Sequence, residues 1–282
     1  MRRRLLELAQ AFALLTRLPM HWLAAPIRGR PLPQPPPARG GGSAHGSPSP
    51  CGRGSPLATN PADCIWAYPI VGGVVGAIGG GAYWLARGMA MPAGLAAIWA
   101  LAAMLFVTGG FHDDGLADTA DGFAGGATRL RKLEIMRDSR IGTFGALALV
   151  LSLAVRGGAI VAMADRAKVA AALVVAGALG RGAIVGLVLL LRPARADGLG
   201  ATLNRPPTAA AAAAIGIAAV AALVLLPAPL AAGAILLAAA SSVTAAWLSY
   251  AQIGGHTGDV LGAGEQITEC VVLTLLGTAL AT

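Results

Sequence analysis

The fold class is decided by the stretch VAAALVVAGALGRGAIVGLVLLL, which occupies residues 169–191. A helix of this length spans the hydrocarbon core of a bilayer, and Arg181 is the one charged residue in it. Its many glycines and alanines are the small residues that allow helices to pack closely in lipid. The stretch therefore predicts a transmembrane helix that packs against other helices of the chain.

Comparable apolar stretches recur along the chain. Its 282 residues are 56% hydrophobic and only 12% charged, which is far from the average of soluble domains. The last stretch is short for a full crossing and Pro227-Ala-Pro229 is a tight turn, so six spans are an alternative to seven. We predict an all-α, polytopic transmembrane helical bundle with six to seven spans, at 66–86, 91–111, 143–163, 169–191, 209–227, 229–249 and 267–281.

The N-terminal part of the chain differs from this pattern. In residues 1–25 an apolar run is interrupted by Glu7, Gln10 and Arg17, which favours an amphipathic or re-entrant helix over a cleaved signal peptide. Residues 26–61 are dense in Pro, Gly, Ser and Arg and predict a flexible linker, because this composition buries little apolar surface. Residues 62–282 then form the transmembrane domain, which would carry any catalytic site.

Lysine and arginine predict the orientation of the bundle. They concentrate in segments 112–140 and 192–205, which the positive-inside rule places on the cytoplasmic side. Counting spans places 250–266 on the same side. We attribute the net charge of +8 to contacts with anionic lipid, because no basic face interleaved with aromatic residues suggests nucleic-acid binding. We expect a multi-pass protein whose partner is the lipid bilayer, with no nucleic acid.

Acidic residues gather in the segment HDDGLADTADGF, residues 112–123. If this segment is helical, Asp114, Asp118 and Asp121 share one face, because their spacing is i, i+4, i+7. No lysine or arginine between Phe111 and Thr128 balances them, and oxygen ligands without cysteine favour Mg²⁺ over zinc. We predict that the three aspartates bind Mg²⁺ and through it the phosphates of a substrate. A solvated helix end is the alternative.

Three arginines are candidates for binding such phosphates. Arg137 and Arg140 follow the acidic segment, and a guanidinium can bind phosphate oxygens through two parallel hydrogen bonds. Arg181 lies inside a predicted span, where an arginine is costly without a carboxylate or phosphate partner. It is therefore either a substrate-binding residue or a member of a structural ion pair.

A second polar segment, QIGGHTGDVLGAGEQITE, occupies residues 252–269. Its glycines permit tight turns or close approach to a ligand, although it lacks the Gly-Lys-Ser/Thr ending of a Walker A loop. We expect a loop that brings His256 and Asp259 to the aspartate face. Together with His112 and Asp138 they are the candidates for a general base. A flexible turn without a catalytic role is the alternative.

Five blocks of the sequence resemble the signature of the cobalamin synthase family, the adenosylcobinamide-GDP ribazoletransferases. They follow the family's order and span most of the chain. The stretch 26–61 is longer than the short connection expected in the family, but it lies away from the acidic blocks. The matching blocks are Leu15-Thr-Arg-Leu-Pro19, Tyr68-Pro-Ile-Val-Gly72, Gly110-Phe-His-Asp-Asp-Gly-Leu-Ala-Asp-Thr-Ala-Asp-Gly122, Leu133-Glu-Ile-Met-Arg-Asp-Ser-Arg-Ile-Gly-Thr-Phe-Gly145 and Gly254-Gly-His-Thr-Gly-Asp-Val-Leu-Gly-Ala263.

The resemblance implies an Mg²⁺-dependent enzyme of the inner membrane with its active site facing the cytoplasm. In such enzymes the ribose hydroxyl of α-ribazole, or of its 5′-phosphate, attacks the phosphorus nearest cobinamide in adenosylcobinamide-GDP. GMP leaves, and the product is adenosylcobalamin or its 5′-phosphate. The resemblance implies that Mg²⁺ on the three aspartates neutralises the diphosphate, while Arg137 and Arg140 support its non-bridging oxygens.

Two other classes share part of this pattern. CDP-alcohol-type membrane phosphotransferases carry Asp-x-x-Asp-Gly-x-x-Ala-Arg, and the arginine is missing after Asp118-Thr-Ala-Asp121-Gly-Phe-Ala-Gly. A secondary transporter is disfavoured because the acids cluster at span ends on one side and no inverted repeat is visible. The sequence leaves the oligomeric state open, a homo-oligomer included.

Overall fold

A computed structural model describes residues 2–17 and 60–281, which form helices and turns without a β-strand. The predicted linker lies outside the described residues except at 60 and 61. Two short N-terminal helices precede the bundle. The elements are α1 (Arg2–Leu15), η2 (Pro61–Ala67), α2 (Tyr68–Gly88), α3 (Ala93–Thr108), α4 (Phe111–Gly125), α5 (Arg129–Ile135), α6 (Thr143–Met163), α7 (Arg166–Leu190), α8 (Leu199–Thr202), α9 (Thr208–Leu225), α10 (Ala228–Ile253) and α11 (Gly258–Ala279).

The predicted all-α membrane bundle is confirmed. Within the described residues, six helices are long and apolar enough to cross a bilayer. The bent pair of α3 and α4 raises the number to seven if it is counted as one span. The predicted span 91–111 therefore needs correction, because α3 ends at Thr108 and the chain turns by 90° into α4.

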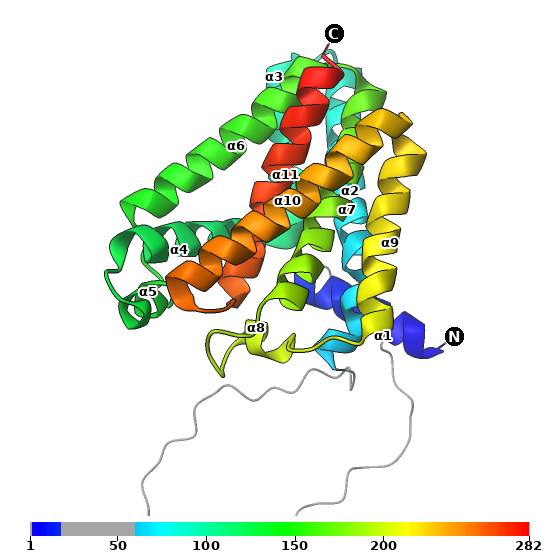
Figure 1. Cartoon of the computed structure of the whole chain (residues 1–282). Coiled ribbons are helices and arrows are strands. Elements are labelled where there is room, and N and C mark those ends of the chain that lie inside the picture. Colours follow the sequence, from blue (N-terminus) through cyan, green and yellow to red (C-terminus); the bar gives the residue numbers. More distant parts are fainter. Residues whose placement is uncertain (1, 18–59, 282) are drawn as a thin grey trace, which may run out of the picture.

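The charged segments lie together at one end of the bundle, which we call the polar end. Figure 1 shows α1, α4, α5, α8 and the α10–α11 turn at this lower end. The turns between α2 and α3, α6 and α7, and α9 and α10 lie at the opposite end with the C-terminus. The predicted gathering of 112–140, 192–205 and 250–266 on one side is thus present in the fold.

The last span is longer than predicted. Instead of 267–281, α11 covers Gly258–Ala279, and the turn before it is only Gly254 to Thr257. The glycines and acids of 258–269 lower the hydropathy of this stretch, but most of them face neighbouring helices rather than lipid. The expected active-site loops are therefore largely helical: the acids lie on α4 and on the first turns of α11.

Close helix packing depends on glycine, most of all between α2 and α7. A Cβ atom added at Gly72 would collide with the carbonyl oxygen of Gly177, and one added at Gly76 with that of Leu173. A Cβ at Gly80 would come within 2.9 Å of Ala170 Cα. The two backbones therefore touch at three positions along more than two helical turns, as the small residues of 169–191 predicted.

We expect Gly76→Ala to lower the free energy of unfolding by about 1–3 kcal/mol, because the methyl group forces the two backbones apart. Gly81→Ala is the matched control on the same helix, since nothing lies within 4 Å of an added Cβ there. It should be neutral or slightly stabilising, because alanine is the better helix former. Unfolding of the purified variants in mixed micelles measures both; equal effects would contradict the packing argument.

Candidate active site

The helix that carries the acids starts at a sharp bend. Gly109 and Gly110 both adopt left-handed backbone conformations, with φ of 67° and 68°, which residues with a side chain rarely adopt. The first ends α3 and the second immediately precedes α4. The bend directs α4 across the polar end, and the predicted helical spacing of Asp114, Asp118 and Asp121 is confirmed.

Two glycines bring α4 against the start of α11. A Cβ atom added at Gly115 would lie 2.8 Å from the carbonyl oxygen of Asp259, and one at Gly262 would lie 3.2 Å from the Cα of His112. This close crossing places Asp259 beside Asp118, and the negative charge of Asp259 raises the pKa of the Asp118 carboxyl. The expected meeting of the two polar segments is therefore present.

A buried ion-pair network fixes α4 to the bundle. Arg156 of α6 bonds Asp113 at 2.7 Å and Glu269 of α11 at 3.3 Å. Arg181 of α7 pairs with Glu265 and Glu269. Both arginines are only 2% exposed. We call these five residues the buried network. Arg156 was not among the predicted site residues, although a lone arginine in the apolar stretch 143–163 was a visible signal.

Asp121 has a structural task at this site. Its carboxylate accepts hydrogen bonds from the backbone N–H groups of Gly142 at 2.7 Å and Gly145 at 2.9 Å. It thus satisfies free donors at the start of α6 and complements the positive end of that helix dipole. Of the three predicted metal ligands, Asp121 is the one already occupied by protein contacts.

The other two acids of the face have no such partners. The side chains of Asp114 and Asp118 make no hydrogen bond or ion pair with any described residue. Partial burial, and then the charges of Asp114, Asp259 and Asp121, raise the pKa of Asp118 to about 7. A cation at this face would offset that repulsion.

The ligands that the aspartates offer are carboxylate oxygens, which are the kind of ligand that Mg²⁺ prefers. Within the described part of the chain, no three His, Cys, Asp or Glu side chains are arranged to hold a metal ion by themselves. Mg²⁺ commonly takes one or two carboxylates and completes its shell with water and substrate phosphates. Asp114 and Asp118 fit that pattern better than a closed three-aspartate site.

The arginines predicted to bind substrate are all paired with carboxylates. Arg137 bonds Asp197 at 2.6 Å on the surface, and Arg140 bonds its neighbour Asp138 at 2.6 Å. Arg181 lies in the buried network, away from water. For Arg181 this favours the structural ion pair over substrate binding, because the side chain is buried and paired with two carboxylates.

The four candidates for the general base differ in their surroundings. His112 and His256 are each 1% exposed, and burial lowers the pKa of His256 to about 4. The hydrogen bonds from Arg140 hold the pKa of Asp138 well below its ordinary value, which weakens it as a base. Asp259 is half-buried beside the aspartate face and accepts hydrogen bonds from Thr257 and Arg195.

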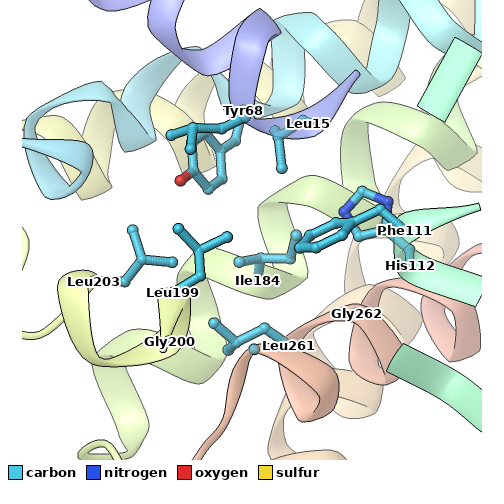
Figure 2. A pocket seen from close by; sticks show the side chains of 12 residues that line it. Leu15, Tyr68, Phe111, His112, Ile184, Leu199, Gly200, Leu203, Leu261 and Gly262 are labelled. Carbon is cyan, nitrogen blue, oxygen red and sulfur yellow. The ribbon is translucent and has the colours of Figure 1, made fainter. Parts of the chain in front are cut away.

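A small apolar pocket separates this site from the N-terminal helix. Figure 2 shows Phe111 and His112 on one side of it, with Tyr68 and Leu15 above Leu199 and Leu203. Its volume of about 20 Å³ is that of a single water molecule. The pocket therefore marks where α1 and α8 close over the start of α4, and it is too small for a substrate.

These features define a multi-pass helical membrane protein with an acidic site, partly open to water, at the polar end of its bundle. The family model described as cobalamin-5-phosphate synthase matches residues 48–277. The chain belongs to this family.

Curated relatives agree with the family match. The chain is 44% identical over 226 residues to a protein of Bradyrhizobium diazoefficiens named adenosylcobinamide-GDP ribazoletransferase, a match covering 79% of this chain and 86% of that protein. Proteins of the same name from Mesorhizobium japonicum and Azorhizobium caulinodans are 42% and 43% identical, over 78% and 74% of this chain and 85% and 81% of their own lengths. No solved structure matches the chain.

Proposed function

We propose that this protein is an adenosylcobinamide-GDP ribazoletransferase. It would transfer the cobinamide phosphate of adenosylcobinamide-GDP to the ribose hydroxyl of α-ribazole, or of its 5′-phosphate, with release of GMP. The family match over residues 48–277 and the names of the relatives support this reaction over a CDP-alcohol phosphotransferase or a transporter. The observation that carries the chemistry is a pair of carboxylates beside Asp259, those of Asp114 and Asp118, that have no partner in the described part of the chain.

The reaction requires the hydroxyl oxygen to form a bond to the phosphorus nearest cobinamide as the bond to the GMP oxygen breaks. Mg²⁺, when bound, would neutralise the charge on the diphosphate oxygens. Asp114 and Asp118 would hold it, and Asp121 would keep the start of α6 in place against them. Asp259 is the best-placed candidate to accept the hydroxyl proton, and Arg195 would orient its carboxylate.

We also propose that the polar end faces the cytoplasm and that the protein lies in the inner membrane. Opposite the polar end, the cations of the described residues are Arg87, Arg166 and Lys168. The polar end carries many more, which supports this orientation by the positive-inside rule: Arg3, Arg4, Arg17, Arg129, Arg131, Lys132, Arg137, Arg140, Arg192, Arg195 and Arg205.

The test is turnover by the full-length protein in liposomes with adenosylcobinamide-GDP, α-ribazole and Mg²⁺. We expect GMP and adenosylcobalamin in equal amounts. EDTA should stop the reaction and excess Mg²⁺ should restore it, because without a cation the two carboxylates repel the negatively charged diphosphate. A folded protein that releases no GMP would contradict the proposed reaction, and turnover unaffected by EDTA would contradict the metal requirement alone.

A further inference from the structure

A cleft of about 640 Å³ opens at the polar end beside the aspartate face. Its walls come from the end of α1, the α3–α4 bend, the first turn of α4 and α6. Arg17, Asp114, Phe111 and Leu149 are among the lining residues, so the cleft combines charged and apolar surface. Its volume lies within the range of pockets that bind small molecules and cofactors, which is large enough for a nucleotide.

Arg17 is held firmly at the edge of this cleft. Its backbone N–H donates to the carbonyl oxygen of Val107 at 2.7 Å, which ties the end of α1 to the last turn of α3. Its guanidinium donates to the carbonyl oxygen of Gly109 at 3.5 Å. A guanidinium has five N–H donors, so this bond leaves most of its donors unused. Arg17 is exposed, and no described carboxylate pairs with it.

This sets Arg17 apart from three other arginines at the polar end. Arg137, Arg140 and Arg195 each bond a carboxylate. Asp114 lines the same cleft, and its carboxylate also has no partner among the residues that the structure describes. Within the described residues, a cation and an anion without ion-pair partners thus line a single cleft, which suits a phosphate group that Arg17 would bind directly and that Mg²⁺, when held by Asp114, would help to neutralise.

From this arrangement, and resting on the proposed function, we infer that Arg17 binds the phosphate of the departing guanosine nucleotide, which lies in the 640 Å³ cleft. The attacking nucleoside must lie near the general base that accepts its hydroxyl proton. Asp259, the best-placed candidate for that base, does not line this cleft, and neither does Asp118. The acceptor therefore approaches over Asp118 and Asp259, while the nucleotide half of the donor lies between Arg17 and Asp114.

The test compares Arg17→Gln with the wild-type protein in liposomes. Glutamine can still donate to the Gly109 carbonyl oxygen, so the anchoring of α1 is kept while the charge is removed. We expect the KM for adenosylcobinamide-GDP and the inhibition constant of GMP to rise about 10- to 100-fold, because hydrogen bonds to charged groups are lost. The KM for α-ribazole should stay within about twofold, and Arg17→Lys should fall between the two proteins.

Arg131→Gln is the matched control, because Arg131 is exposed at the same end and, among the described residues, its ion-pair partner is Glu134 on α5 alone. It should leave both KM values unchanged. Equal rises for donor and acceptor in Arg17→Gln, or a lower kcat with an unchanged donor KM, would overturn the inference and leave Arg17 a purely structural role. Wild-type turnover is measured first: its absence would refute the proposed function, whereas an active wild type with an indifferent Arg17→Gln would refute only this inference.

Discussion

Replacing Asp118 by asparagine is expected to lower kcat on the order of 10³-fold. Asparagine keeps the shape of the side chain but removes the charge that would hold Mg²⁺ against the diphosphate. Such metal contacts are worth several kcal/mol of transition-state stabilisation, and each 1.4 kcal/mol corresponds to about a factor of ten in rate. Single-turnover rates of GMP release at saturating donor measure this loss without interference from product release.

The control for this substitution is Asp165→Asn. Asp165 caps the start of α7 at the opposite end of the bundle, where it accepts hydrogen bonds from Ala167 and Lys168. Asparagine is an equally good cap, so kcat should be unchanged. If Asp118→Asn is folded and keeps kcat within about tenfold of the wild type, the aspartate face does not bind the catalytic metal.

Removing Arg156 is expected to have the largest effect on stability. Arg156→Met removes the cation that pairs with both Asp113 and Glu269. Removing one partner of a buried ion pair costs about 3–5 kcal/mol of stability. Unfolding in mixed micelles should show this loss. Arg131→Met breaks an exposed pair with Glu134 and should change stability little.

A double-mutant cycle tests whether the contact itself is responsible. Arg156→Met combined with Asp113→Asn should destabilise by less than the sum of the single losses, with a coupling of about 0.5–3 kcal/mol. Additive losses would mean that the two side chains do not depend on each other. Because Asp113 precedes Asp114 in α4, the single variants should also lower turnover in the fraction that remains folded.

The sequence predicted those parts of the site that depend on local spacing. Asp114 and Asp118 lie three and seven residues into one helix, so helical periodicity alone placed them on one face. The apolar stretches predicted the bundle because crossing a bilayer requires a minimum helix length. Most lysines and arginines of the bundle lie in the segments between these stretches, and their positions predicted that cations gather at the polar end.

Other features depend on partners that are distant in sequence. Asp121 accepts hydrogen bonds from Gly142 and Gly145, and no local pattern distinguishes such a capping acid from a metal ligand. The start of α11 was missed because glycines and acids interrupt its apolar run, although their polarity is satisfied inside the bundle. The bend at Gly109 and Gly110 depends on backbone angles that a pair of glycines permits but does not require.

The buried network also has a consequence for how the chain is made. Arg156 precedes Glu269 by 113 residues and Arg181 precedes it by 88, so α6 and α7 are synthesised well before α11. An unpaired arginine costs about 2.5–3.5 kcal/mol at the centre of a membrane helix during insertion. Until the ribosome delivers the last helix, Arg181 lacks both of its carboxylate partners and must remain near water or pair with lipid phosphates, whereas Arg156 can already pair with Asp113 of α4. Ribosomes stalled before residue 258 should therefore hold an unfinished bundle that is readily digested by proteases.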